Sequence, residues 1–362
     1  MKFPEVKLSL GFRFGNLTAS DLDQWEYLSL VGKDSTPFHS FEWEQALRLS
    51  FPDETSVYWG IWRNDELIAI WPTSVVPLLG GTMLTPLFLH ADYFASAPTI
   101  KNGLGMMLPR ELISYITEVA KQRYRAWSWY LPIPGNWAFA ETAPYYGFEV
   151  RRSNKQPSIV LHTSVKPEVV WKNCPHGGLR TCVRKAERVG LEVRESSDQR
   201  DLNEYFVVKY PEARQPTAGH LTELSFWEAI RRLFVCRGKA KLFVTCHEDR
   251  IIGGAIVFFQ NNKAYLWNMG SMQSTWRMHP NHILLWNMIK WAHNSGIECI
   301  DCGNGTKGTQ YFVNRNLADY ERIDQVALTF PINRLGKLQL RVHAWAPSTL
   351  ISWYTRRFSG IL

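Results

Sequence analysis

Residues 241–315 read KLFVTCHEDRIIGGAIVFFQNNKAYLWNMGSMQSTWRMHPNHILLWNMIKWAHNSGIECIDCGNGTKGTQYFVNR, and this stretch decides the fold. Its apolar runs predict three strands, KLFVTCHED, RIIGGAIVFFQ and AYLWNMGSM, joined by short polar turns. A polar loop, a helix, a fourth strand (GIECIDCG) and a second helix around GTQYFVNR follow. A strand that leads through a loop and a helix into a parallel strand builds a crevice at the strand ends, where ligands tend to bind.

A weaker copy of the opening of this stretch lies 184 residues earlier. Residues 57–72 (VYWGIWRNDELIAIWP) and 241–258 (KLFVTCHEDRIIGGAIVF) share an apolar strand, an acidic or amide turn and a second strand, and a helix and a strand follow each. Solenoid repeats are shorter, about 20–50 residues. The pattern therefore predicts a duplicated α/β domain with mixed sheets: an N-terminal half over residues 1–155, a C-terminal half with the active crevice over 156–335, and a tail over 336–362.

Length and composition favour two globular cores, because 45% of the 362 residues are hydrophobic. No apolar run approaches the roughly 20 residues that span a bilayer, and the N-terminal stretch has no signal-peptide core. We therefore expect a cytoplasmic protein. The six cysteines are scattered through the chain, so reduced thiols are expected rather than a disulfide framework.

The C-terminal tail is basic and aromatic. From Arg334 to Leu362 there are five Lys/Arg and no Asp or Glu, which gives +5 of the net charge of +8. Such a tail suits an anionic surface, either membrane headgroups at the periphery of a bilayer or RNA. The alternative is a terminal helix that docks through its aromatic residues and leaves a solvated basic face.

Capping residues and turns locate the elements of the N-terminal half. Helices are predicted over residues 18–32, with Thr18 or Ser20 as N-cap, and over 40–51, with Ser40 as N-cap. Between the two strands of residues 57–72, the Asn64-Asp65 pair predicts a tight hairpin.

In its order of elements the chain resembles the GNAT superfamily, specifically the double-domain branch that joins FemAB-type aminoacyl transferases with acetyltransferases of cellulose and envelope polysaccharide synthesis. The resemblance covers most of the chain, and its pieces are PFHSFEWEQA (37–46), LRTCVRKAERVGLEV (179–193), the strand pair around residues 249–254, and the strand–loop–helix of residues 268–305.

This resemblance implies tandem GNAT-like domains and acyl transfer without a covalent enzyme intermediate. A β-bulge would splay two parallel strands, Ala264–Met269 and Ile297–Cys302, and the pantetheine arm of acyl-CoA would enter the gap. A backbone N–H near Asn268, Met269 and Gly270 would polarise the thioester carbonyl, as oxyanion donors do.

The following loop would bind the pyrophosphate at a helix N-terminus. It reads RMHPNH from Arg277 to His282, so Arg277, Asn281 and His282 are the expected phosphate-binding residues, and Pro280 suits a first helical turn. Simple GNAT enzymes carry glycines here and this loop has none, which also fits the FemAB-type branch, where the donor is an aminoacyl-tRNA.

Acid–base candidates follow the fourth strand. Asp301, at the strand end, could take a proton from the acceptor, or it could cap the following loop. Tyr311 matches the place where simple GNAT enzymes often keep a tyrosine near the leaving thiolate, but an ordinary amphipathic tyrosine is the simpler explanation. Lys307 could bind a phosphate or carboxylate, or could be a solvated loop lysine.

A basic helix offers a binding face for phosphates. Arg180, Arg184 and Lys185 recur at helical spacing and share a face, which suits a nucleotide-sugar, a lipid-linked sugar or tRNA. The alternative is a surface whose cations pair with the neighbouring glutamates.

A zinc site is not predicted. His279 and His282, and then Cys299 and Cys302, give HxxH and CxxC pairs, but cysteines three apart in a strand point to opposite faces. Buried strand thiols account for them better, and a redox role is also not expected because CxxC normally opens a helix.

The sequence therefore predicts an acyltransferase that uses acyl-CoA, and most readily acetyl-CoA, to modify an amine or hydroxyl of an envelope sugar or similar metabolite. One alternative is transfer from charged tRNA to a cell-wall precursor. The other is a non-catalytic scaffold that binds an anionic glycan or lipid.

Overall fold

The computed structural model describes residues 6–7, 11–51, 56–85, 97–102, 110–152, 157–210, 224–304 and 307–345. The chain forms two compact units. Unit 1 contains residues Met1–Asn154 and Asp324–Leu362, and unit 2 contains Lys155–Ile323. Each unit is built on one mixed sheet.

Unit 1 has a nine-stranded sheet of order β1-β2-β3-β4-β5-β7-β16-β8, with β6 paired to β4. Its strands are β1 (Val6–Lys7), β2 (Phe12–Asn16), β3 (Ser56–Arg63), β4 (Glu66–Leu78), β5 (Gly81–Thr85), β6 (Thr99–Ile100), β7 (Ala126–Pro134), β8 (Glu149–Arg152) and β16 (Gln325–Pro331). Its helices are α1 (Leu22–Val31), α2 (Phe41–Ser50), α3 (Arg110–Tyr124), α4 (Ala138–Thr142) and α11 (Arg334–Trp345).

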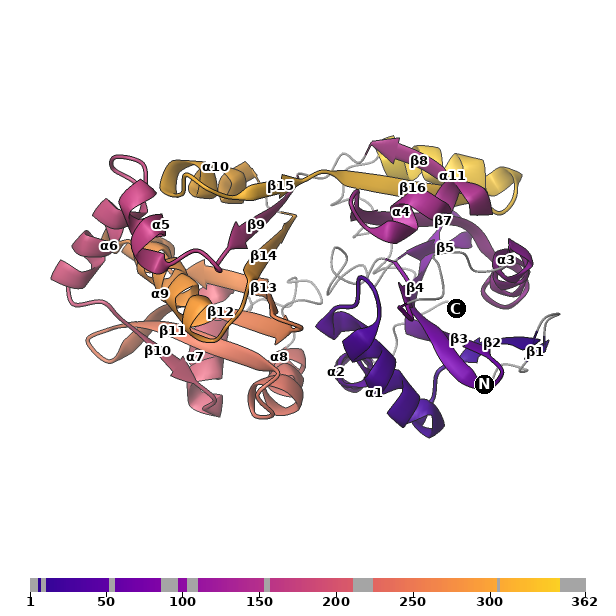
Figure 1. The fold of residues 1–362 in the computed structure, drawn as a ribbon, viewed down its shortest axis with the longest axis horizontal. Coiled ribbons are helices and arrows are strands. Elements are labelled where there is room, and N and C mark those ends of the chain that lie inside the picture. Colours follow the sequence, from indigo (N-terminus) through magenta and orange to yellow (C-terminus); the bar gives the residue numbers. More distant parts are fainter. Residues whose placement is uncertain are drawn as a thin grey trace. The chain divides into compact units, whose positions relative to one another are not determined.

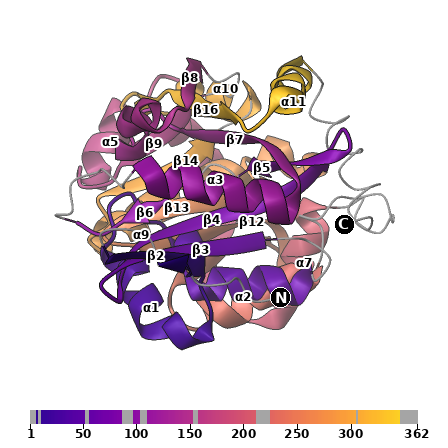
Figure 2. The same ribbon diagram turned by 90° about the vertical axis from the view of Figure 1, so that its right-hand side faces the viewer.

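Tryptophans from neighbouring strands form the core of unit 1. Trp59, Trp71 and Trp129 are fully buried and contact one another, with ring centroids 4.9–6.4 Å apart. Figure 2 shows α3 lying across this sheet, where it adds Ile113 and Ile116 to the same cluster. The predicted cap at Ser40 is confirmed, because its Oγ accepts the Trp43 N–H at 3.3 Å.

Unit 2 has a seven-stranded sheet of order β10-β11-β12-β13-β14-β9-β15. Its strands are β9 (Ser158–His162), β10 (Glu192–Ser196), β11 (Ala240–His247), β12 (Arg250–Gln260), β13 (Lys263–Ser271), β14 (Cys299–Asn304) and β15 (Glu321–Ile323). Its helices are α5 (Pro167–Asn173), α6 (Leu179–Arg188), α7 (Gln199–Lys209), α8 (Leu224–Ile230), the 3₁₀ helix η8 (Gln273–Met278), α9 (Pro280–Asn294) and α10 (Lys307–Asn316).

Helices cover both faces of the unit 2 sheet (Figure 1). Ala255 of β12 packs in one cluster with Val183 of α6 and Leu284 of α9. The next residue back, Gly254, points to the opposite face, where an added Cβ would come within 2.9 Å of the Tyr205 ring of α7. Side chains alternate between the faces of a strand, so α6 and α9 lie on one side and α7 on the other.

The two units repeat one hairpin design. The turn residues Asn64-Asp65 between β3 and β4, and Glu248-Asp249 between β11 and β12, all have positive φ, from 47° to 66°. These values are typical of the tight turns that match strand twist. Each hairpin also carries a register shift three residues before its turn, at Ile61/Trp62 and at Thr245/Cys246. The predicted tandem organisation of α/β units with mixed sheets is therefore observed.

The boundaries of the predicted halves differ from those of the units. Residues 324–335 were predicted in the C-terminal half and 336–362 as a separate tail, but β16 pairs with β7 and β8 and so belongs to unit 1. Strand β9 lies between β14 and β15 in the unit 2 sheet, and β16 lies at the corresponding position between β7 and β8 in the unit 1 sheet. The strand that follows β8 in the sequence thus belongs to unit 2, and the strand that follows β15 belongs to unit 1. One cut through the chain cannot separate the two sheets.

Helix α11, which the sequence assigned largely to the tail, packs against unit 1. Gln339 is fully buried, accepts a hydrogen bond from Ser128 Oγ at 2.8 Å and donates one to the Leu78 carbonyl oxygen at 2.5 Å. Leu340 joins a small apolar cluster, and Gly336 lies so close to the Trp127 carbonyl that an added Cβ would overlap it. Residues 346–362 lie outside the described part of the chain.

Among the described residues, each helix is either too short or too polar to cross a membrane.

Candidate functional site

Strands β13 and β14 diverge in the middle of the unit 2 sheet. They are parallel and pair only from Lys263 to Tyr265, after which β13 continues to Ser271 without β14 beside it. The register between β12 and β13 shifts at Ile256/Val257, which leaves an extra residue on β13 at this point. The predicted bulge and splayed strands are therefore present.

The backbone of Met269 faces the gap between the splayed strands. The Met272 N–H donates to the Ile252 carbonyl oxygen at 2.9 Å, and Met269 lies opposite Ala255. Hydrogen-bonded and non-bonded pairs alternate along antiparallel strands, so Met269 occupies a non-bonded pair and its N–H and C=O point away from β12. The N–H is placed to donate to a carbonyl oxygen in the gap.

A cavity of about 610 Å³ opens beside this gap. The end of β13, the start of α9 and one side of α10 form most of its wall, and α6 contributes Cys182. Trp276 and Tyr311 lie at its rim and are 56% and 63% exposed. The lining residues are Cys182, Met269, Ser271, Trp276, His279, Pro280, Asn281, His282, Gly308, Tyr311, Phe312, Arg315 and Asn316.

Buried polar atoms in the cavity wall have no hydrogen-bond partner among the described residues. They are Ser271 Oγ, Asn281 Oδ1, His282 Nδ1 and Asn316 Oδ1. A buried polar atom without a partner is costly, and such atoms are usually satisfied by water or by a ligand. The two amide oxygens are acceptors, so they suit a ligand that carries N–H or O–H groups.

Helix α9 begins at the cavity with its positive end. His279 is the N-cap in the left-handed conformation (φ 64°), and Pro280 is the first helical residue. Free N–H groups of a first helical turn favour an anion. Burial lowers the pKa of His282 to about 4, with further lowering from His279 and Arg315, and burial followed by Lys185 lowers the pKa of His279. Both histidines are therefore neutral near pH 7, and Lys185 and Arg315 supply the positive charge.

A polar network lies on the opposite face of β13. The Lys209 amine at the end of α7 donates to the Met269 carbonyl oxygen at 2.6 Å. Tyr205 OH donates to Asn268 Oδ1 at 2.9 Å, and Asn268 Nδ2 donates to Tyr210 OH at 3.3 Å. Burial lowers the pKa of Lys209, because a poorly solvated ammonium is disfavoured. The gap is thus bordered by a donor N–H and, next to it, an amine whose pKa burial lowers.

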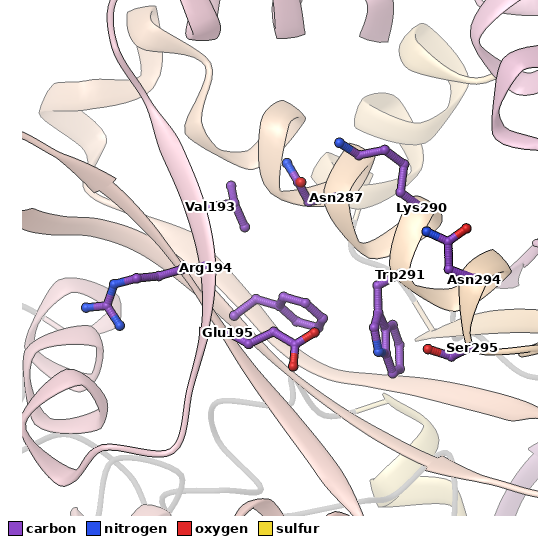
Figure 3. Close-up of a pocket in the computed structure, with 9 residues that line it drawn as sticks. Val193, Arg194, Glu195, Asn287, Lys290, Trp291, Asn294 and Ser295 are labelled. Carbon is purple, nitrogen blue, oxygen red and sulfur yellow. The ribbon is translucent and has the colours of Figure 1, made fainter.

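A second cavity of about 390 Å³ lies between β10 and the later turns of α9 (Figure 3). Figure 3 shows Asn287, Lys290 and Trp291 along one helix, while the Arg194 side chain extends away from the other labelled side chains. Arg194 forms an ion pair with Asp201 instead. No lining residue of this cavity carries an unpartnered buried polar atom among the described residues, so we favour the cavity at Met269 as the functional site.

The structure brings part of the predicted donor site together. Met269, Asn281, His282 and Tyr311 line the cavity, and Tyr311 OH accepts from Arg315 at 2.8 Å. Asn268 belongs instead to the tyrosine network on the other face. Gly270 lies against Lys209, whose Cδ would be 2.6 Å from an added Cβ.

The remaining predicted residues take other positions. Asp301 Oδ1 accepts hydrogen bonds from Ser158 Oγ and from the Gly303 N–H, both at 2.8 Å, and Asp301 does not line the cavity. It is held as the loop cap that the sequence left as its alternative. Arg277 is exposed on η8 and is also absent from the lining.

The three predicted basic residues of α6 do not line the cavity, and one of them acts on a residue that does. Lys185 acts electrostatically on His279, whereas the Arg184 guanidinium lies over the Trp171 ring at 5.9 Å. Arg180 acts electrostatically on Cys174. Lys307 begins α10, but its side chain lies outside the described part of the chain.

Sequence reasoning missed several residues that complete the site, and those on α6 and α7 come from segments distant in the sequence. Lys209 precedes its partner Met269 by 60 residues. The sequence singled out the basic residues of α6 and Tyr311 of α10, but the polar pattern of these helices did not indicate Cys182, Arg315 or Asn316 as cavity residues. The missed residues are Cys182, Tyr205, Lys209, Tyr210, Ser271, Arg315 and Asn316.

Comparisons with known proteins agree with this architecture. Residues 177–313, all within unit 2, match the family described as acetyltransferase (GNAT) domain. A comparison with curated proteins gave no match.

Among solved structures, the chain is similar to FemX (TM-score 0.63, 14% identity), covering 90% of this chain and 99% of FemX. It is also similar to a tandem GNAT protein from the clavulanic acid biosynthesis pathway (TM-score 0.57, 13% identity, 89% and 99% covered). A third is L-PGS from Bacillus licheniformis (TM-score 0.56, 11% identity, 91% and 99% covered). These likenesses show the fold. Residues 177–313 of unit 2 therefore match the acetyltransferase (GNAT) domain family, and the chain shares its overall fold with FemX and with the tandem GNAT protein.

Proposed function

We propose that the protein transfers an acyl group, most readily acetyl, from acyl-CoA to an amine or hydroxyl of an envelope sugar or a similar metabolite. The observation that carries this proposal is the Met269 N–H, which faces the gap between splayed strands beside a cavity with four unpartnered polar atoms. The class of acceptor comes from the resemblance to the double-domain GNAT branch, and variable loops set acceptor pockets.

The cavity fits the donor in size and in chemistry. A volume of about 610 Å³ falls within the range of small-molecule sites. Asn281 Oδ1 and Asn316 Oδ1 can accept from the amide N–H groups of a pantetheine arm. The start of α9, with Lys185 and Arg315 nearby, suits the phosphates.

The chemistry needs one donor and one base at the gap. The Met269 N–H would stabilise negative charge on the thioester oxygen as the acceptor nitrogen or oxygen bonds to the carbonyl carbon. The Lys209 amine, whose pKa burial lowers, would in its unprotonated form take the proton that the acceptor loses. The carbon–sulfur bond then breaks, and Tyr311, which accepts from Arg315, can supply a proton to the leaving thiolate. The enzyme forms no covalent bond to the acyl group.

Charged tRNA remains a second candidate donor. The loop before α9 has no glycine, and His279 occupies a left-handed position that glycine normally favours. The His279 side chain therefore leaves less room for the phosphates of acyl-CoA to reach the first N–H groups of α9. The cations Lys185 and Arg315 suit either phosphate donor. Under this alternative the acceptor is a cell-wall precursor.

Calorimetric titration of the full chain with acetyl-CoA and with coenzyme A tests the donor. We expect saturable binding of both, and Asn281→Ala should weaken it about 2–10-fold, since one hydrogen bond contributes roughly 0.5–1.5 kcal/mol. Asn294→Ala is the matched control, because Asn294 lies on the same helix but lines the second cavity (Figure 3).

Arg277→Ala separates the cavity from the exposed loop. Because Arg277 is exposed and does not line the cavity, its loss should weaken binding less than the loss of Asn281. A larger effect at Arg277 would place the phosphates outside the cavity. Absence of binding by both ligands would refute acyl-CoA as donor and favour charged tRNA. Binding without turnover on any amine or hydroxyl would favour the non-catalytic scaffold.

A further inference from the structure

Three metal-ligating side chains converge at one end of the cavity. The ligand atoms of Cys182, His279 and His282 all lie within 4.8 Å of one another. Cys182 comes from α6, whereas His279 and His282 come from the N-cap and first turn of α9. Two helices that pack in the same apolar cluster therefore bring the three side chains together.

The backbone conformation places His279, and the ring of His282 packs against the Phe312 ring with centroids 4.9 Å apart. His279 is held in the left-handed conformation, which costs free energy in a residue with a Cβ and often marks a functional position. The ring centroids of the two histidines are 5.0 Å apart with planes at 88°, so both rings reach the same volume from different directions. His282 Nδ1 is buried and has no partner among the described residues.

The third side chain adds the ligand that selects the metal. Cys182 is buried, and its Sγ makes a long hydrogen bond, 3.8 Å, to the Gly177 carbonyl oxygen. A thiolate and two imidazoles favour a borderline-soft ion such as Zn²⁺, with bonds of about 2.3 Å to sulfur and about 2.0–2.1 Å to nitrogen. Tetrahedral bonds of that length need ligand atoms roughly 3.5 Å apart, so small side-chain rotations would complete the site.

We propose that Cys182, His279 and His282 bind one Zn²⁺ ion and leave its fourth coordination position open to the cavity. Zinc sites with three protein ligands keep such a position for water or substrate. Lys185 and Arg315 act electrostatically on these ligands, so their positive charge favours an anionic fourth ligand over water. The three ligands line the same cavity as Met269, but the proposed metal binding does not depend on acyl transfer.

Equilibrium dialysis of the chelator-treated full chain against Zn²⁺, followed by elemental analysis, measures the stoichiometry. We expect one Zn²⁺ per chain. Loading with Co²⁺ should give a thiolate-to-metal charge-transfer band together with intense visible bands that report tetrahedral geometry. Cys182→Ser, which keeps the size of the side chain, should abolish the charge-transfer band. It should also weaken Zn²⁺ binding by more than the roughly 10–100-fold caused by losing an outer-shell partner.

Two further variants make the test specific. His282→Gln should weaken Zn²⁺ binding, while Cys236→Ser, at an exposed cysteine elsewhere in unit 2, should leave it unchanged. The proposal is overturned if the protein retains less than about one ion per chain, or if the charge-transfer band survives in Cys182→Ser. Loss of the band in Cys236→Ser would also overturn it. Zinc binding is measured without any acyl donor. A failure of the zinc proposal therefore leaves the result of the acyl-CoA titration unchanged, and a failure of the acyl-CoA proposal leaves the zinc measurement unchanged.

Discussion

Replacing Lys209 by Met tests the proposed base at the gap. The substitution keeps the apolar stem and removes the amine that donates to the Met269 carbonyl oxygen at 2.6 Å. Losing a positioned general base costs about 10²–10⁴-fold in rate, which corresponds to roughly 2.7–5.5 kcal/mol of barrier. Because Lys209 does not line the cavity, we expect kcat to fall by this amount while KM for acyl-CoA stays nearly constant.

The pH dependence of the parent protein gives the second part of this prediction. The pKa of Lys209 is lowered by burial in the folded protein from its ordinary value of 10.5, which the unfolded chain keeps. At a pH between the lowered pKa and 10.5, the unfolded chain therefore binds a proton that the folded chain does not. The free energy of unfolding therefore rises with pH through that window and falls as the pH is lowered through it. Activity should rise with pH over the lower part of the window, as the amine loses its proton.

Lys209→Met should remove both pH dependences. The variant loses one hydrogen bond, which contributes about 1 kcal/mol to the free energy of unfolding. It also loses the unfavourable cost of burying a charged amine. We therefore expect its stability below the window to match or exceed that of the parent, measured by urea unfolding at several pH values. Turnover is followed as thiol release from acetyl-CoA with glucosamine as a probe acceptor.

The control for this prediction is Lys241→Met, at a lysine that pairs with Glu195 on the edge of the same sheet. It should leave kcat and its pH profile unchanged. If Lys209→Met stays within about threefold of the parent and keeps the parent's pH profile, Lys209 is not the base. Equal losses in both variants would point to a general effect of lysine removal.

Three further outcomes follow from the structure. Gln339→Ala should lower the free energy of unfolding by roughly 2–5 kcal/mol, because it leaves Ser128 Oγ and the Leu78 carbonyl oxygen without this partner. A change under about 1 kcal/mol in thermal or urea unfolding would contradict this expectation. A chain that ends at Ile323 should lose the protease protection of unit 1 and keep that of unit 2. If residues 324–362 were a simple tail, both units would stay protected after its removal. Asp301→Asn should change kcat less than about tenfold, since the side chain caps a turn; a loss near that of Lys209→Met would restore Asp301 as the base.

Much of the donor side of the site could be predicted from the order of strands. A strand, a loop, a helix and a parallel strand fix where the gap opens, and Met269, Asn281 and His282 follow from that order. Arg277 was predicted to bind phosphate from the same loop, and this role stays a prediction. The sequence does not show which way a 3₁₀ turn faces, and the structure places Arg277 on the exposed side of η8.

The base and the exchanged strand could not be predicted in the same way. Lys209 contacts Met269 only because α7 packs on β13, a pairing between segments that share no motif. The apolar pattern of Gln325–Pro331 predicts a strand, but it fits either sheet equally well, and the pairing with β7 and β8 decides the unit. Asp301 shows the converse: its position at a strand end was correct, and its hydrogen bonds match the capping role that sequence reasoning left as the alternative. Its role as a base stays a prediction.

The place of β16 has a consequence for how the protein acquires its structure during synthesis. All strands of unit 2 lie before residue 324, so the ribosome finishes them before it makes the strand that separates β7 from β8. Until then β7 exposes an unpaired edge, and such edges invite pairing with other chains. The nascent chain therefore completes its second sheet first. Its first sheet must wait with an open edge until the last described strand emerges.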